Sequence, residues 1–262
     1  MLSVLPAAPL KTLDSGALSV AILDAASRIS DTYPAILIEA IGAAAYLHRG
    51  QTRANRAGMP RTPYSEHPLR NALRALRMGV TDLDVIAAII LHDTIEDCSS
   101  VIATDYLGMD ASSMSAREQR ECALDWMEAA FGTEITSLVK AVTNPLPSGK
   151  AVPIETRHQR YATFVHDAIH GDARVFIVKF VDFADNAAGL HHNVAGIGAG
   201  VNDKMAARLA AKYLPLIHIF EAELAASYGE IMTLVSAEGL ESIIEHLTSA
   251  KTTLPVLIDL AA

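Results

Sequence analysis

The sequence has few residues of several kinds, and each shortage argues against a class of protein. Its two cysteines, Cys98 and Cys122, form no CxxC pair, so neither a disulfide framework nor a zinc knuckle is indicated and a reducing cytoplasmic setting is expected. Residues 1–13 lack a basic leader followed by a long apolar stretch. The longest strongly apolar run, Val85–Leu91, is far too short to span a bilayer. We therefore expect a soluble protein without a membrane partner.

Basic and aromatic residues are also scarce. Lys and Arg number 21 against 30 Asp and Glu, which gives a formal net charge of −9. This balance argues against duplex nucleic acid as a partner, because such binding depends on clustered Lys and Arg. Hydrophobic residues make up 51% of the chain and aromatic residues only 5%, with many alanines, which suit closely packed helices better than strands. We predict an all-α fold in which residues 1–262 form one helical bundle.

Apolar residues at helical spacing predict helices separated by loops rich in glycine and proline. The helices predicted at 83–96 and 173–190 are apolar nearly all round and should be central, with Thr81 or Asp82 capping the first. The loop 49–63 is the one strongly basic stretch of an acidic chain. Other helices are predicted at 17–28, 34–48, 67–79, 117–131, 134–142 and 156–170, followed by a long C-terminal pair, with an irregular segment at 99–116 and a loop at 144–153.

The end of the predicted helix 83–96 carries an unusual concentration of ionisable residues. A continuous helix would place His92 above Glu96 and Asp93 above Asp97, so the carboxylates would be close together. Burying such groups unpaired costs roughly several kcal/mol each. A divalent cation would relieve the repulsion, since imidazole and carboxylate together are suitable ligands. The alternative interpretation is that this turn emerges into water.

Two distant polar residues favour the metal interpretation. His67 follows the basic loop, and Asp182 lies inside the second apolar helix, where a carboxylate is anomalous by the same burial argument. Added to His92 and Asp93, they give two imidazoles and two carboxylates with room left for water. Such a set is typical of a catalytic metal site.

The order of these residues resembles the H…HD…D signature of the HD phosphohydrolase superfamily. The longer pattern, from about Ile41 to Leu216, is similar to the hydrolase domain of RelA/SpoT proteins, and no alarmone synthetase domain follows it. This matches the small, single-domain alarmone hydrolases. The segments that carry the resemblance are His48-x-x-Gln51-x-Arg53, Pro63-Tyr64-x-x-His67-Pro68, Ala87-Ala88-x-x-Leu91-His92-Asp93-Thr94-x-Glu96-Asp97, Phe131-Gly132, Val142-Thr143, Val178-Lys179-x-x-Asp182-x-x-x-Asn186 and Tyr213-Leu214-Pro215-Leu216.

The resemblance implies a cofactor, a catalytic pair and a reaction. Glu96 and Asp97 match the family's pair that orients and deprotonates the attacking water. The implied reaction removes pyrophosphate from the ribose 3′ position of ppGpp or pppGpp and leaves GDP or GTP, so the expected partner is a small nucleotide. One divalent ion, manganese in that family, would be held by His67, His92, Asp93 and Asp182.

The resemblance also implies substrate contacts. Arg53 matches an arginine that packs against the guanine, a use that suits a planar cation. Asn186 matches an asparagine near the ribose and the scissile phosphate. Arg157 and Arg160 lie where the family places basic residues before the last active-site helix. They either clamp the distal phosphates or form an ordinary solvated helix face.

Two positions depart from the family pattern. Ala54 and Phe183 stand where the family usually has basic residues, which removes positive charge expected near a polyphosphate. This leaves open a different nucleotide, such as an adenosine alarmone, the 2′-phosphate of NADPH or a deoxynucleotide. A non-catalytic nucleotide-sensing module is a further alternative, against which the intact Glu96 and Asp97 argue. The apolar tail after Leu216 either completes the core or forms a contact in a homo-oligomer.

Overall fold

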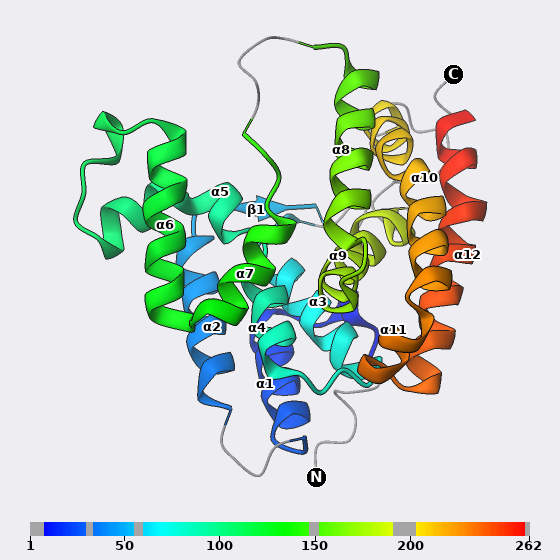
Figure 1. Cartoon of the computed structure of the whole chain (residues 1–262), viewed down its shortest axis with the longest axis horizontal. Coiled ribbons are helices and arrows are strands. Elements are labelled where there is room, and N and C mark those ends of the chain that lie inside the picture. The colour runs from blue at the N-terminus through cyan, green and yellow to red at the C-terminus, as the bar shows by residue number, and fades with distance from the viewer. Residues whose placement is uncertain (1–7, 30–33, 55–59, 147–151, 191–202, 260–262) are drawn as a thin grey trace. The chain divides into compact units, whose positions relative to one another are not determined.

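The structure is a computed structural model that describes residues 8–29, 34–54, 60–146, 152–190 and 203–259 (Figure 1). Over these residues the chain is helical apart from two short strands, β1 (Thr52–Arg53) and β2 (Thr62–Pro63), which pair within the basic loop. The all-α prediction is confirmed. No helix in the described ranges has both the length and the apolar character needed to cross a bilayer.

The chain divides into two compact units, and the single-domain organisation stays a prediction. Unit 1 comprises residues 1–51, 63–76 and 81–150, and unit 2 comprises residues 52–62, 77–80 and 151–262.

Unit 1 is built around a buried helix. The side chains of residues 85–91 in α4 are fully buried, and α2 and α7 both contact this helix. As predicted, Asp82 caps α4, because its carboxylate accepts hydrogen bonds from the backbone N–H groups of Asp84 and Val85. The helices of the unit are α1 (Ser15–Ala26), α2 (Ala35–Leu47), α3 (Glu66–Arg77), α4 (Leu83–Leu91), α5 (Thr94–Val101), α6 (Ala116–Phe131) and α7 (Thr133–Val142).

The predicted continuous helix 83–96 is interrupted at His92 and Asp93, so that prediction is wrong there. Two side chains donate hydrogen bonds to backbone carbonyl oxygens at this turn. His92 Nδ1 lies 2.8 Å from the carbonyl oxygen of Ile89, and the Thr94 hydroxyl donates to that of Leu91 at 2.7 Å. The polar pair therefore occupies a turn between α4 and α5 rather than the last turn of one helix.

Unit 2 has an aromatic core. Phe176, Phe180 and Phe183 lie on one face of α9, and each ring packs against Phe220 of α10 with centroids 5.0–5.6 Å apart. Helix α10 also contacts α8 and α12. The helices of the unit are α8 (Ile154–Ile169), α9 (Ala173–Phe183), which continues as a π-helical turn (Ala184–Ala188), α10 (Asp203–Ala226), α11 (Tyr228–Leu234) and α12 (Ala237–Asp259).

The position of Phe183 corrects one prediction. Its side chain is 2% exposed and contacts Tyr213 as well as Phe220, both on α10. Helical spacing from Phe176 and Phe180 places residue 183 on the core face of α9. The interpretation of Phe183 as a loss of positive charge near a polyphosphate is therefore wrong, because Phe183 is a packing residue in the core of unit 2.

Gly239 in the first turn of α12 is expected to be essential for the stability of unit 2. A Cβ atom at this position would lie 2.0 Å from the carbonyl oxygen of Met78, which is backbone and cannot move aside cheaply. The same oxygen accepts a hydrogen bond from the N–H of Ser236 at 2.9 Å. We expect Gly239→Ala to lower the free energy of unfolding by about 1–3 kcal/mol or more, as overpacking does. Urea denaturation measures this change.

Gly229→Ala is the matched control for this substitution. Gly229 lies in the neighbouring helix α11, is exposed, and has open space where a Cβ would be placed. Because alanine is the better helix former, the control should leave stability unchanged or raise it slightly. Equal stabilities of the two variants would contradict the proposed clash.

Candidate active site

His67 and His92 bring their ring nitrogens toward one carboxylate oxygen in unit 1. Nε2 of His92 lies 3.0 Å and Nε2 of His67 lies 3.8 Å from Oδ2 of Asp93. The two rings are edge to face with centroids 5.4 Å apart, and both histidines are buried. His67 is positioned by the first turn of α3, and the other two residues by the turn between α4 and α5. The structure thus brings together three of the four predicted metal ligands within this unit.

The hydrogen bonding of His92 suits a metal ligand. A carbonyl oxygen only accepts, so the contact to Ile89 requires the proton on Nδ1, and in the neutral ring Nε2 presents a lone pair to Asp93. Lone pairs of a nitrogen and a carboxylate oxygen 3.0 Å apart repel, unless a proton or another cation lies between them. A backbone carbonyl that fixes the outer nitrogen is the usual support of a metal-bound histidine. His67 and His92 could therefore hold a metal ion.

Tyr64 and His48 support Asp93 with a hydrogen bond and a stacked ring pair. The Tyr64 hydroxyl donates to Oδ2 of Asp93 at 2.7 Å, and the Tyr64 ring stacks on His48 with centroids 4.7 Å apart. His48 Nδ1 pairs with Oε1 of Gln51 at 2.8 Å. Cys98 is buried beside His48, with Sγ 3.5 Å from both the carbonyl oxygen of Leu47 and Nδ1 of His48.

Burial raises the pKa of the Cys98 thiol to about 12, and the negative charges of Asp97 and Asp93 act in the same direction. The thiol is therefore protonated and plays no part as a nucleophile.

Glu96 is held by a residue that sequence reasoning missed. The side-chain Nδ2 of Asn144 donates to Oε2 of Glu96 at 2.8 Å and to Oε1 at 3.2 Å, and the backbone N–H of Asn144 donates to Oε2 at 3.1 Å. Asn144 follows α7, and the sequence predicts it only as the first residue of the loop 144–153. The one available signal was its place directly after the Val142-Thr143 motif.

Asp97 shows how strongly negative charge is concentrated here. Burial of its carboxyl group, together with the charges of Asp93 and Glu96, raises its pKa to about 6, although the residue as a whole is exposed. Both Glu96 and Asp97 lie in the first turn of α5, where the helix dipole favours negative charge. A nearby cation would lower the electrostatic cost of this arrangement.

Unit 2 links three of the predicted residues in a chain of hydrogen bonds. Arg53 Nη2 donates to Oδ1 of Asn186, and Nδ2 of Asn186 donates to Oδ1 of Asp182, both at 2.6 Å. Because the guanidinium only donates and the carboxylate only accepts, these partners fix which end of the Asn186 amide faces each of them. Asp182 is 8% exposed, so this contact satisfies part of a buried carboxylate. The substrate contacts implied for Arg53 and Asn186 stay predictions.

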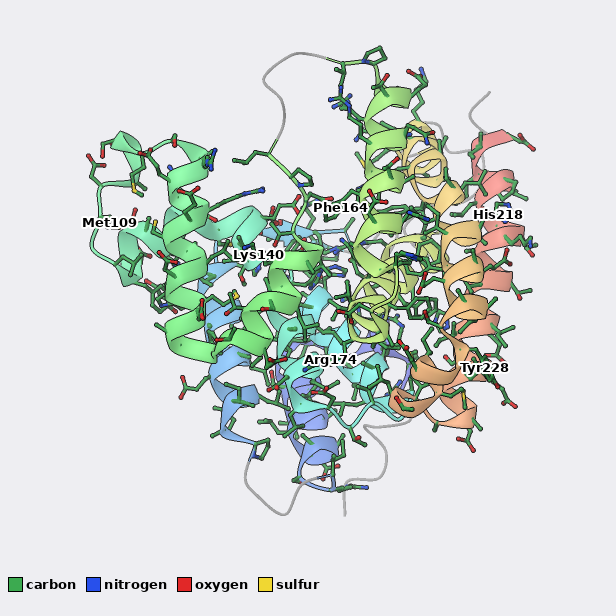
Figure 2. All side chains as sticks on the ribbon, in the orientation of Figure 1. Met109, Lys140, Phe164, Arg174, His218 and Tyr228 are labelled. Carbon is green, nitrogen blue, oxygen red and sulfur yellow. The ribbon has the colours of Figure 1, made fainter. Side chains whose placement is uncertain are left out.

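Three further basic residues of unit 2, Lys179, Arg157 and Arg160, differ in how far they are buried. Lys179 of α9 is buried, and its ammonium lies 5.8 Å from the ring centroid of Tyr161 and 5.6 Å from that of Phe164, which Figure 2 labels on α8. Arg157 and Arg160 of α8 are exposed. Both interpretations of these two arginines, a phosphate clamp and a solvated helix face, therefore stay open.

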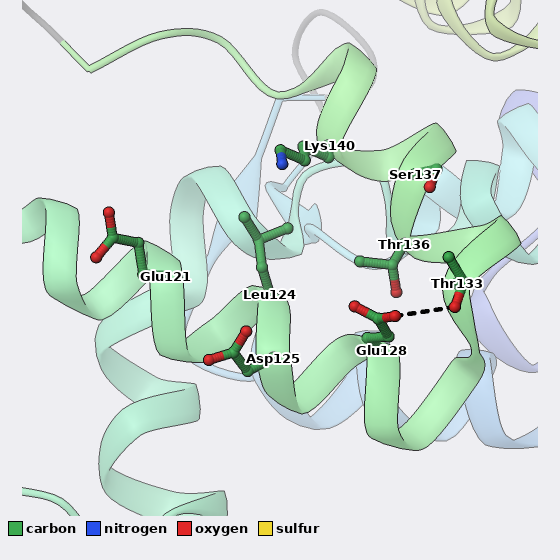
Figure 3. Close-up of a pocket in the computed structure, with 8 residues that line it drawn as sticks. All are labelled: Glu121, Leu124, Asp125, Glu128, Thr133, Thr136, Ser137 and Lys140. Atoms are coloured by element: carbon green, nitrogen blue, oxygen red, sulfur yellow. Dashed lines mark hydrogen bonds between the residues drawn. The ribbon is translucent and has the colours of Figure 1, made fainter.

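A separate hollow of about 250 Å³ lies between α6 and α7 (Figure 3). Glu121, Asp125 and Glu128 line it opposite a single lysine, Lys140, and none of the predicted site residues contributes to it. Its acidic lining would repel a polyphosphate. We therefore do not assign it to a nucleotide.

Comparisons with known proteins agree with the resemblance in the motifs. The chain is 31% identical over 148 residues to guanosine-3′,5′-bis(diphosphate) 3′-pyrophosphohydrolase MESH1 of Mus musculus, which covers 56% of this chain and 64% of that protein. The Homo sapiens protein of the same name is 31% identical over 147 residues, with the same two coverages. The chain thus matches less than two thirds of the length of these relatives. No protein-family model matches it.

A solved structure shares the fold. It is described as a metazoan ortholog of SpoT that hydrolyzes ppGpp and plays a role in starvation responses. The TM-score is 0.52 at 22% sequence identity, and the match covers 77% of this chain and 97% of that one. The helical fold is therefore the one that the metazoan SpoT ortholog adopts. The predicted resemblance to small alarmone hydrolases is confirmed by the sequence similarity to the mouse and human pyrophosphohydrolases.

Proposed function

We propose that this chain is a metal-dependent hydrolase that removes pyrophosphate from the 3′ position of ppGpp or pppGpp. The observation that carries the proposal is the approach of His67 Nε2 and His92 Nε2 to one oxygen of Asp93, directly before the carboxylates of Glu96 and Asp97. The reaction named for the mouse and human relatives supports the choice of substrate.

We further propose, from the order of the motifs along the chain, that Asp182 supplies the fourth ligand. His67, His92 and Asp182 are residue types that could hold a metal ion together. The ion would lower the pKa of a bound water and stabilise negative charge on the phosphoryl group that this water attacks, while the bond from phosphorus to the ribose 3′ oxygen breaks. Manganese is the ion that we propose, because the resembling family uses it.

The remaining roles follow from residue chemistry. Glu96 and Asp97 would orient the attacking water and accept its proton, as carboxylates near a metal site do. Arg53 and Asn186 would contact the nucleoside, and Arg157 and Arg160 the distal phosphates. A reducing cytosol suits an enzyme of this kind with two unpaired cysteines.

A nucleotide panel tests the proposed function. Purified protein with Mn²⁺ is incubated with ppGpp, pppGpp, an adenosine alarmone, NADPH and a deoxynucleotide, and pyrophosphate and phosphate release are measured separately. We expect GDP and pyrophosphate from ppGpp at the highest kcat/KM of the panel. A higher kcat/KM for a nucleotide other than ppGpp or pppGpp would refute the proposed substrate. Binding of ppGpp without turnover in Mn²⁺, Mg²⁺ and Zn²⁺ would instead favour a sensing module.

A further inference from the structure

The contacts of Glu96 lead to an inference that rests on the proposed hydrolase function. We propose that Asn144 is a positioning residue that holds the Glu96 carboxylate in the orientation needed to accept a proton from the attacking water. None of the motifs that resemble the family includes this residue.

The contact is made by two different donor groups of one residue. The Nδ2 amide reaches both oxygens of Glu96, and the backbone N–H reaches Oε2 as a second donor. The carboxylate only accepts, so the amide must turn its nitrogen toward Glu96. The partners are 48 residues apart in the chain and both half-buried, so the contact is a tertiary one that water screens only in part.

The neighbouring residues restrain the backbone at Asn144. Pro145 follows it and disfavours the helical conformation at the preceding residue, and Thr143 is already extended with φ −72° and ψ 119°. On its other side, Arg120 of α6 donates a hydrogen bond to the carbonyl oxygen of Asn144. Asn144 is thus held by α6 through its carbonyl oxygen, while its two donor groups contact Glu96 of α5.

Orientation matters for a glutamate more than for a shorter acid. Its side chain has three rotatable bonds, and ordering it carries one of the larger costs in side-chain conformational entropy. A general base must come within hydrogen-bonding distance of the proton that it accepts. An ionised carboxylate accepts about four hydrogen bonds and Asn144 donates three, so about one acceptor position, on Oε1, is left for water. Asn144 therefore orients the base without using up its capacity to accept.

Two substitutions at this position separate orientation from charge. Asn144→Ala keeps the backbone donor and removes the amide, whereas Asn144→Asp keeps the shape, replaces the donor by an acceptor and places a like charge beside Glu96. A lost hydrogen bond to a charged group corresponds to about a tenfold change or more. We expect kcat to fall about tenfold in Asn144→Ala and further in Asn144→Asp, with KM and the Mn²⁺ affinity measured by calorimetry within about twofold of wild type.

The pH profile provides a readout that a merely structural role would not move. A second carboxylate at position 144 adds like charge beside the proposed base, so the acidic limb of the kcat profile should shift to higher pH in Asn144→Asp but not in Asn144→Ala.

Thr133→Ala is the matched control, because it removes another hydrogen bond to a glutamate at the opposite end of α7. The Thr133 hydroxyl donates to Oε1 of the exposed Glu128 at 2.9 Å, the dashed line in Figure 3. This variant should keep wild-type kcat.

The outcomes distinguish the inference from the function on which it rests. If wild-type protein releases no pyrophosphate, the proposed function fails. If wild type is active and both Asn144 variants keep its kcat, or lose activity only in proportion to their unfolded fraction in thermal melts, Asn144 is not a positioning residue. A lowered kcat in well-folded variants, with the shifted acidic limb in Asn144→Asp, supports the inference.

Discussion

Asp93→Asn is expected to lower the rate of pyrophosphate release by on the order of a thousandfold or more, because it removes the charge on which the proposed metal centre depends. Oδ2 of Asp93 lies near both histidine Nε2 atoms and accepts from the Tyr64 hydroxyl. The asparagine keeps the shape and size of this side chain. It cannot balance a divalent ion, so calorimetry should show a large loss of Mn²⁺ affinity together with the loss of turnover.

Asp125→Asn is the matched control for the charge change. Asp125 is exposed on α6 and lines the acidic hollow, where none of the proposed ligands lies. Its substitution should leave Mn²⁺ affinity and turnover unchanged. A fully active Asp93→Asn protein with wild-type metal affinity would rule out Asp93 as a ligand and, with it, the proposed metal centre.

Glu96→Gln is expected to show a different pattern of loss. We expect kcat to fall by about 10²–10⁴-fold, the usual contribution of a general base, while KM and Mn²⁺ affinity stay close to wild type. The glutamine can still offer one oxygen to Asn144, but it cannot take up a proton. Steady-state kinetics at saturating ppGpp, combined with calorimetric metal titration, separates this effect from that of Asp93→Asn.

The control for Glu96→Gln is Glu121→Gln on α6. Glu121 forms an exposed ion pair with Arg117 at 2.8 Å, and such pairs contribute little to stability. This variant should be fully active. If Glu96→Gln and Asp97→Asn both retain wild-type kcat, neither carboxylate is the base and the proposed mechanism is wrong.

Local sequence patterns predicted most of the helices because the responsible signals lie within a few residues of each other. Asp82 precedes the apolar run of α4 and caps it, as a short polar residue before such a run indicates. The bounds of α6 and α7 lie within one residue of the predicted ranges, and Gly132 separates them with a φ of 85°.

The features that were missed depend on contacts that local patterns do not encode. Helical periodicity does not show the interruption at His92, where side chains bond to the carbonyl oxygens of Ile89 and Leu91. Asn144 contacts a glutamate 48 residues away. Phe183 was compared with a family position, although its spacing from Phe180 and Phe176 already favoured the core. His67, His92 and Asp93 lie close together in unit 1, as the motif order indicated, whereas the contacts that support them required the tertiary structure.

The buried thiol beneath His48 has a consequence for how such a site withstands oxidants. The thiolate is the form that attacks peroxides and alkylating reagents, and a thiol with a pKa of about 12 is almost entirely protonated at neutral pH. Cys98 is also buried, whereas Cys122 on α6 is half-buried. The cysteine that directly follows Glu96 and Asp97 is therefore unreactive toward oxidants. The chain can carry a cysteine at this position without making its chemistry depend on the redox state of its surroundings.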